Sequence, residues 1–187
     1  MNITELPENI RRAYAEIDEI LAQPTPRKIP RRMAFMLRPP ILAGGVINLV
    51  LGVIIPIIML LCGAPPKIAA IMAAISLPLG TILTAIGVIS IARKVNVLSN
   101  GIRGKGRIAK ISALPYHANS EGFFKVTIIT GMGDKVSTIV SSRAVDAFSN
   151  ISNSKENSLD VVYIPGKKLC VLPLAIAQRM QYKNLMY

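Results

Sequence analysis

Apolar residues are distributed unevenly along the chain, and two long uncharged runs dominate the pattern. Residues 41–62 and residues 68–92 contain no Asp, Glu, Lys, Arg or His. Each run exceeds the roughly 20 residues that a helix needs to cross a hydrocarbon core about 30 Å thick. The segment from Gly63 to Lys67 contains two prolines, which cannot continue a helix. Residues 41–92 are therefore predicted to form a hairpin of two transmembrane helices.

The chain before the hairpin divides into two parts. Within residues 1–22, apolar positions recur at the spacing of one helix face: Leu6, Ile10, Tyr14, Ile17 and Leu21. This predicts an amphipathic helix, which we expect to dock on protein; lying flat on the bilayer is the alternative, in which its acidic residues would face anionic lipid. Residues 23–40 hold five prolines among basic residues, a composition that resists helix and predicts an extended linker.

After the second run, the apolar period changes from helical to that of β-strands. The expected domain covers residues 93–187 and is a small all-β domain, barrel or sandwich-like, with a short C-terminal helix. We expect Gly104 and Gly106 to let the chain turn into the sheet, His117 to lie in a loop, and a short helix to form near residues 143–148. The predicted strands cover residues 107–114, 123–130, 135–141, 159–164 and 169–172.

Three features of this part resemble a known family. They are the pattern Gly104-x-Gly106-x-Ile108, a Val-x-Ile hairpin around a Gly-Asp turn, and the segment Leu-Asp-Val-Val-Tyr-Ile-Pro at residues 159–165. Over residues 104–172 the chain resembles the bacterial domain-of-unknown-function family numbered thirty-five ninety-two, although Ile164 replaces the usual Asp. The resemblance implies a small β domain beside a membrane and implies no catalytic residue.

The charge distribution predicts orientation and partners. The chain has 22 Lys and Arg against 10 Asp and Glu, and basic residues flank both runs, whereas only Lys67 lies between them. Basic flanks stay on the cytoplasmic side, so both termini are expected in the cytoplasm, beneath a bacterial inner (plasma) membrane. Anionic lipid head groups are the expected partner, and nucleic acid is disfavoured because exposed stacking aromatics are few. The candidate anionic-surface patch is Arg31, Arg32, Arg38, Arg103, Lys105, Arg107 and Lys110.

Residues suited to catalysis or metal binding are sparse. There is one histidine, His117, and the acidic residues after the runs are scattered rather than paired. A metal or general acid–base site needs several converging groups, so we expect no metal, no cofactor and no enzyme. A membrane-bound enzyme using His117, Asp134 or Asp160 is the weaker alternative. Cys62 and Cys170 are expected on opposite sides of the membrane and therefore unpaired.

Small or polar residues recur every four positions in each run. In lipid such stripes allow close helix approach, either within the hairpin or with a partner. The favoured function is a non-enzymatic inner-membrane protein that presents its β domain for protein interaction or self-assembly. The alternatives are an immunity protein that neutralises a membrane-active toxin, and a membrane-tethered binder of anionic lipid or nucleic acid. The candidate helix-packing or partner face is Gly44, Asn48, Gly52, Ser76, Gly80 and Thr84.

Overall fold

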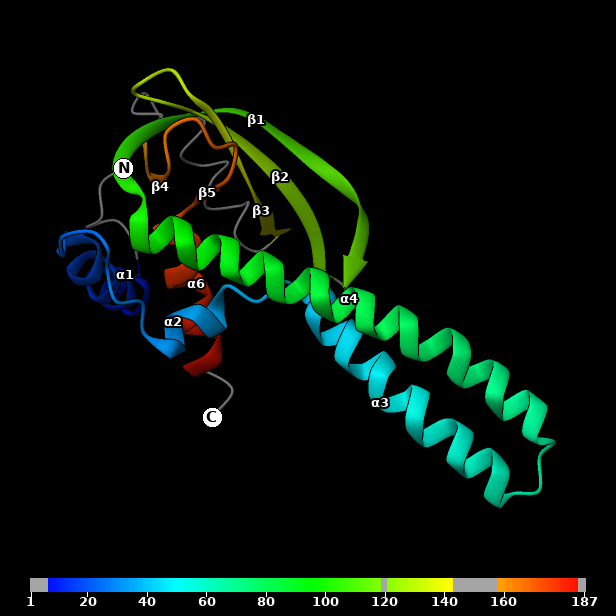
Figure 1. Cartoon of the computed structure of the whole chain (residues 1–187). Helices are drawn as coiled ribbons and strands as arrows, with labels where there is room; N and C mark the ends of the chain where they lie inside the picture. Colours follow the sequence, from blue (N-terminus) through cyan, green and yellow to red (C-terminus); the bar gives the residue numbers. More distant parts are fainter. Residues whose placement is uncertain (1–6, 119–120, 143–157, 185–187) are drawn as a thin grey trace. The chain divides into compact units, whose positions relative to one another are not determined.

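The chain forms two compact units (Figure 1). The computed structural model describes residues 7–118, 121–142 and 158–184. One unit combines Met1–Leu37 with Lys94–Tyr187, and the other is Arg38–Arg93. The first unit is therefore discontinuous in sequence: the predicted N-terminal helix and most of the linker belong with the strands. The predicted short helix near residues 143–148 lies outside the described residues.

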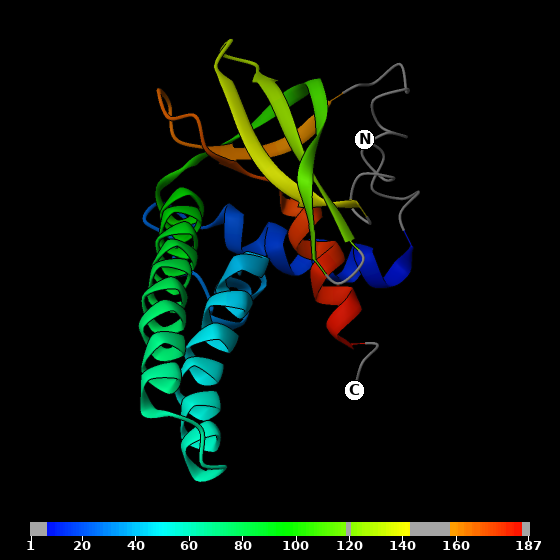
Figure 2. The same cartoon turned by 90° about the vertical axis from the view of Figure 1, so that its right-hand side faces the viewer.

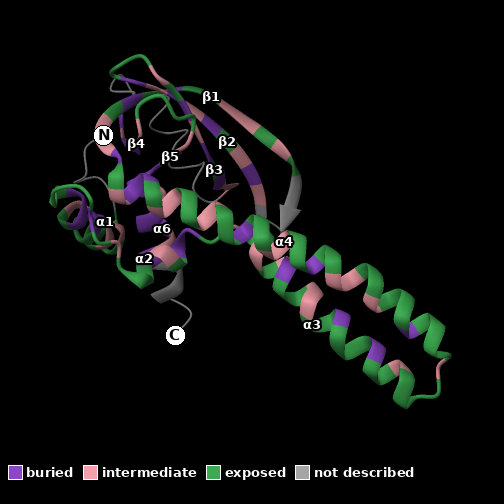
Figure 3. Cartoon of the chain, in the orientation of Figure 1, coloured by how far each residue is buried: buried purple, intermediate pink, exposed green. Residues whose placement is uncertain are grey.

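The second unit is a hairpin built from helix α3 (Pro40–Leu61) and the first part of helix α4 (Pro66–Asn100). Both helices are long and apolar enough to span a membrane. Only 17% and 11% of their most apolar stretches are buried within the structure, whereas a helix in a soluble core would be mostly buried (Figure 3). The second predicted run ended at Ala92, but α4 continues to Asn100 because Val97 and Leu98 pack into the core of the other unit.

Five antiparallel strands form one curved sheet in the order β3-β2-β1-β4-β5. Three strands joined as a meander, with a fourth returning beside the first, make a Greek key. A bridge between Ser137 and Leu169, with the Ser137 N–H donating to the Lys168 carbonyl at 2.7 Å, nearly closes the sheet into a barrel. The strands are β1 (Ile102–Ala118), β2 (Glu121–Thr130), β3 (Lys135–Ser141), β4 (Leu159–Tyr163) and β5 (Cys170–Val171).

Strand β1 is longer than predicted, and this corrects two expectations. Its pairing with β2 contains two irregularities, which let a long strand curve around the barrel. His117, expected in a loop, lies within β1. The chain leaves helix α4 at Gly101, whereas Gly106 lies inside the strand, where an added Cβ would be 2.4 Å from Ile128 Cγ2. Gly106 therefore permits close strand packing rather than the turn into the sheet.

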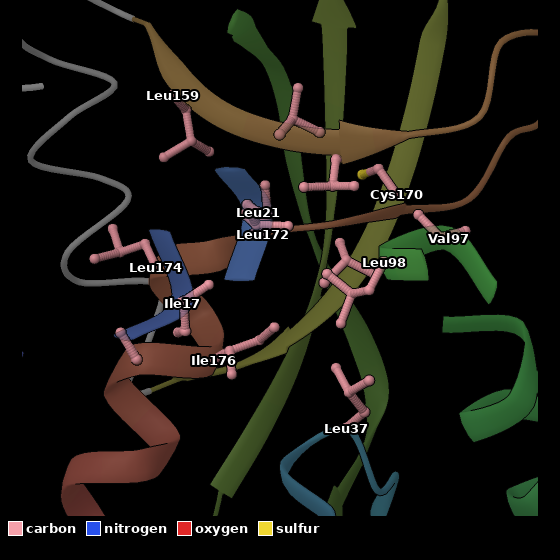
Figure 4. Close-up of a cluster of buried hydrophobic side chains, with 14 of the residues drawn as sticks. Ile17, Leu21, Leu37, Val97, Leu98, Leu159, Cys170, Leu172, Leu174 and Ile176 are labelled. Carbon is pink, nitrogen blue, oxygen red and sulfur yellow. The ribbon is translucent and has the colours of Figure 1, made fainter. Parts of the chain in front are cut away.

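Three helices cover the inner side of the sheet. Helix α6 (Pro173–Asn184) lies under the strands, and α1 (Glu8–Ala22) packs beside it (Figure 2). The short α2 (Arg31–Met36) corrects the prediction of an extended linker: it begins after Pro30, which is tolerated before a first turn, and it buries two methionines. The shared core includes Ile17, Leu21, Leu37, Val97, Leu98, Leu159, Cys170, Leu172, Leu174 and Ile176 (Figure 4).

Candidate functional site: a cationic face of the sheet

Alternate residues of β1, β2 and β3 form a three-by-three grid on the outer side of the sheet. The strand pairing aligns them in three rows. None of the nine is buried, whereas the intervening Ile128 and Val136 are completely buried. We call this grid the cationic face. Its rows are Arg107, Ile129 and Lys135; Lys110, Thr127 and Ser137; and Ser112, Lys125 and Ile139.

The charge on the cationic face has one sign. Arg107, Lys110, Lys125 and Lys135 are exposed, and none of the nine residues is acidic. Within the described part of the chain, no ion pair joins any of these four cations to a carboxylate. Asp134, the neighbour of Lys135 in the β2–β3 turn, also makes no ion pair there. Within the described residues, the positive charge of this face is therefore not paired with a carboxylate.

Exposed apolar side chains lie on the cationic face and beside it. Ile139 is 46% exposed at one corner, and Met132 is 71% exposed in the adjoining β2–β3 turn. Gly133 has a φ of +84° in that turn, a conformation that glycine adopts without strain. Ile129 lies half-buried at the centre of one row. The surface is thus amphipathic as well as cationic.

Two further cations of β1, Arg103 and Lys105, form ion pairs within the discontinuous domain. Arg103 contacts the Asp18 carboxylate of α1 at 2.6 Å and the Asp160 carboxylate of β4 at 2.8 Å. Lys105 lies 3.3 Å from Asp160, and the buried Tyr14 hydroxyl of α1 donates to the same carboxylate at 2.7 Å. These five residues, called the α1 clamp, connect helix α1 to two strands of the sheet.

The ionisation of the α1 clamp follows from its geometry. Burial alone would raise the pKa of Asp160, but hydrogen bonds from Arg103 and Tyr14 and the charge of Arg103 outweigh it and lower that pKa. Burial also lowers the pKa of Arg103, yet the hydrogen bond and charge of Asp160 raise it overall. Burial, with the bond to Asp160, raises the pKa of Tyr14. Tyr14 thus stays a neutral donor beside an ionised carboxylate.

The predicted anionic-surface patch is divided by the fold. Arg107 and Lys110 lie on the cationic face, whereas Arg103 and Lys105 belong to the α1 clamp. Lys125 and Lys135 join the face but were not in the predicted patch, because only strand pairing aligns Lys125 with Ser112 and places Lys135 in one row with Arg107. The alternation of Lys125 with the inward Phe124 and Val126 was the signal that could have found Lys125. The remaining members of the patch are all exposed and lie elsewhere: Arg31 and Arg32 in α2, and Arg38 at the start of the hairpin unit.

A buried arginine joins the segment before the hairpin to the end of α4. The Arg27 guanidinium donates to the carbonyls of Leu98 at 3.0 Å and Gly101 at 2.8 Å, where the helix has no further N–H partners. Its backbone N–H donates to the Ser99 carbonyl, and the Ser99 hydroxyl donates back to the Arg27 carbonyl. Cations suit a helix C-terminus because of the macrodipole. Arg27 therefore caps α4 from a distant part of the sequence.

The structure brings together part of the predicted helix-packing face. A Cβ on Gly52 would lie 3.0 Å from Ser76 Cβ, and one on Gly80 would lie 2.8 Å from the Leu49 backbone N. Thr84 instead meets Gly45, whose added Cβ would be 2.5 Å from the Thr84 backbone N. One predicted member lies off this contact, because Gly44 has nothing within 4 Å of an added Cβ. The Asn48 amide donates within its own helix, to the Gly44 carbonyl.

The two cysteines lie in different surroundings. Cys62 is exposed at the end of α3, and Cys170 is completely buried in the core of the discontinuous unit. Burial raises the pKa of the Cys170 thiol to about 12, so it stays protonated and unreactive near neutral pH. Among the described residues, no three His, Cys, Asp or Glu side chains gather where they could hold a metal ion.

Comparison with known proteins identifies no relative. No family model, curated protein or solved structure matches the chain. The resemblance to the domain-of-unknown-function family therefore stays a prediction.

Proposed function

We propose that this chain is a non-enzymatic bacterial inner-membrane protein whose hairpin crosses the bilayer twice. Its discontinuous domain is held on the cytoplasmic side, where the β-strands present a surface for interaction with other molecules. The exposed apolar surfaces of α3 and α4 support the anchor, since lipid can cover them without any protein partner.

The observation that carries this proposal is the composition of the discontinuous domain. The chain before the hairpin and the chain after it share one hydrophobic core, with Ile17 and Met33 packed together with Leu98 and Val161. The α1 clamp and Arg27 add hydrogen bonds across the same sequence gap. A domain built from both flanks requires both flanks on one side of the membrane, which is what two crossings produce.

The side follows from charge. Basic residues lie before α3 and after the apolar part of α4, whereas Lys67, in the first turn of α4, is the one basic residue at the tip of the hairpin. Lys and Arg close to a span are retained in the cytoplasm during insertion. The domain is therefore assigned to the cytoplasm and the turn to the opposite side.

Thiol labelling in intact cells tests this topology. Starting from a chain with both native cysteines replaced, Lys67→Cys and Met132→Cys supply one thiol in the first turn of α4, at the tip of the hairpin, and one in the domain. A membrane-impermeant maleimide should label Lys67→Cys in intact cells, and Met132→Cys only after the membrane is permeabilised. Labelling of Met132→Cys in intact cells, or release of the protein from membranes by alkaline carbonate, would refute the proposal.

Immunity against a membrane-active toxin is a separate hypothesis with its own test. Protection of cells would then depend on the hairpin and would survive charge reversal of the cationic face. If an interaction role is correct, crosslinking in intact membranes should recover a partner bound to the discontinuous domain rather than to the hairpin.

A further inference from the structure

We infer that the cationic face binds the anionic phospholipid head groups of the membrane that holds the hairpin. This inference rests on the proposed membrane anchor and names the ligand of its domain. Among the described residues, four cations without a carboxylate partner occupy a patch three strands wide on the curved sheet, and no acidic side chain shares that patch. Such a surface attracts a layer of like negative charges.

The apolar side chains on and beside the face fit the same ligand. Of the exposed large hydrophobic residues described in the discontinuous domain, Ile139 lies on the face and Met132 beside it, and the third is Phe35. The head-group and acyl boundary accepts apolar side chains together with cations, as interfacial helices show. A purely aqueous polyanion would offer Ile139 and Met132 no comparable environment.

The distribution of aromatic residues disfavours single-stranded nucleic acid. Its bases bind by stacking on exposed aromatic rings. Phe123 is 4% exposed and Phe124 packs against the core, so neither offers a free ring on the cationic face.

Thr127, Ser137 and Ser112 occupy the positions between the cations and provide hydroxyl groups that can bond phosphate oxygens.

The chain connection favours lipid over a soluble acidic protein. In α4, only the eight residues Arg93 to Asn100 separate the apolar run from the sheet. At 1.5 Å per residue, this length is roughly 12 Å. Head groups are therefore within reach of the tethered domain at all times, and tethering makes their binding intramolecular. A soluble acidic partner would have to compete with that local concentration.

The test uses the full-length protein in lipid nanodiscs. The Cys62→Ser chain carries a fluorophore at Met132→Cys, and the discs contain a lipid with a quencher on its head group. One set of discs is phosphatidylcholine alone, and the other includes one third phosphatidylglycerol. We expect stronger quenching with phosphatidylglycerol, and loss of that difference at high salt because surface charges are then screened.

A matched pair of double variants separates the face from net charge. Lys125→Glu with Lys135→Glu reverses two cations of the cationic face. Arg11→Glu with Lys28→Glu makes the same charge change at exposed positions outside the strands that form it. Each cation near an anionic surface changes the ratio of lipid-bound to unbound domain about fivefold. The double variant of the cationic face should therefore lower this ratio at least about 30-fold. The second pair should leave the quenching unchanged.

The outcomes are distinct from those of the proposed function. Equal quenching in both lipid sets, or equal losses in both double variants, would overturn the head-group assignment. Capture of an oligonucleotide or an acidic protein by the face, with no response to phosphatidylglycerol, would also overturn it. In these cases the anchor can still be intact, as carbonate extraction would show. Continued protection of Cys170 from maleimide confirms that each variant is folded.

Discussion

Two adjacent glycines of α3 allow a controlled test of how the hairpin packs. A Cβ on Gly45 would lie 2.5 Å from the Thr84 backbone N and 2.6 Å from Thr84 Oγ1, whereas a Cβ on Gly44 would meet nothing within 4 Å. Gly45→Ala and Gly44→Ala add the same methyl group to the same helix. Both gain the same helix propensity, up to about 1 kcal/mol. The two variants therefore differ in the interhelical contact alone.

The size of the effect follows from these distances. Ordinary contact begins near 3.4 Å, so Gly45→Ala requires the helices to separate by about 0.9 Å at this point. The nearest group is backbone and cannot rotate away as a side chain could. Overpacking of this kind costs about 1–3 kcal/mol. The unfolding equilibrium constant of Gly45→Ala should exceed that of Gly44→Ala by about 5- to 150-fold.

Unfolding in mixed detergent micelles measures this difference. The full-length protein is titrated with sodium dodecyl sulfate, and helix content and thiol exposure are followed together. We expect Gly44→Ala to match or exceed the wild-type midpoint and Gly45→Ala to fall below it. Equal midpoints for the two variants would show that Gly45 does not face α4, and the hairpin contact described above would then be wrong.

Three further predictions concern the discontinuous domain. Because the Asp160 pKa is lowered on folding, its contribution is complete above the unfolded value near 4 and is lost as pH falls through the folded pKa. Asp160→Asn should lower the free energy of unfolding, measured with urea at pH 7, by about 1–2 kcal/mol, and should remove its fall at low pH. If stability still falls with pH as in the wild type, the proposed role of Asp160 in the α1 clamp is wrong. Arg27→Ala should lower the free energy of unfolding by about 2–4 kcal/mol, with only partial recovery in Arg27→Lys, because three donors to backbone carbonyls are lost. In maleimide labelling at pH 7.5, Cys62 should react while Cys170 stays protected until denaturant is added; fast labelling of Cys170 would contradict its burial.

The sequence was sufficient where a pattern is local and repeated. Two charge-free runs identified both long helices, and the hairpin predicted around the Gly-Asp turn located β3 at residues 135–141, the range that the structure has. The buried face of α1 includes Tyr14, Ile17 and Leu21, which the helical spacing had grouped together. These patterns depend only on the period of one element, so the rest of the fold does not alter them.

The sequence was insufficient where distant segments converge. Arg103 and Arg107 are both basic residues at the start of β1 and look equivalent in the sequence. In the structure, Arg103 pairs with Asp160 and Asp18, whereas no carboxylate in the described residues pairs with Arg107. Nothing in the local pattern of β1 marks this difference, because it depends on β4 pairing with the start of β1 and on where α1 packs. For the same reason, Lys125 and Lys135 could be assigned to one surface with Arg107 only after the register was known.

The hairpin shows a similar limit on a smaller scale. A four-residue repeat selected Gly44 and Gly52 in α3, but the close contacts of that helix are made by Gly45 and Gly52, seven residues apart. Gly80 and Gly87 in α4 are also seven apart and approach Leu49 and Leu42. A seven-residue repeat keeps one seam between two helices that cross at a shallow angle, so the period of contact follows from the pairing of the helices.

Under the proposed function, a domain assembled from both flanks of the hairpin would link folding to membrane topology. Tyr14 and Arg27 are made before the hairpin, whereas Asp160 and the end of α4 follow it. The N-terminal flank thus has no carbonyls of Leu98 and Gly101 to bind until both helices have been made. If only one helix crossed, the two flanks would lie on opposite sides, and the side chains that α1 buries against the core would face water. Hydrophobic burial in the domain and insertion of the hairpin therefore favour the same two-crossing arrangement.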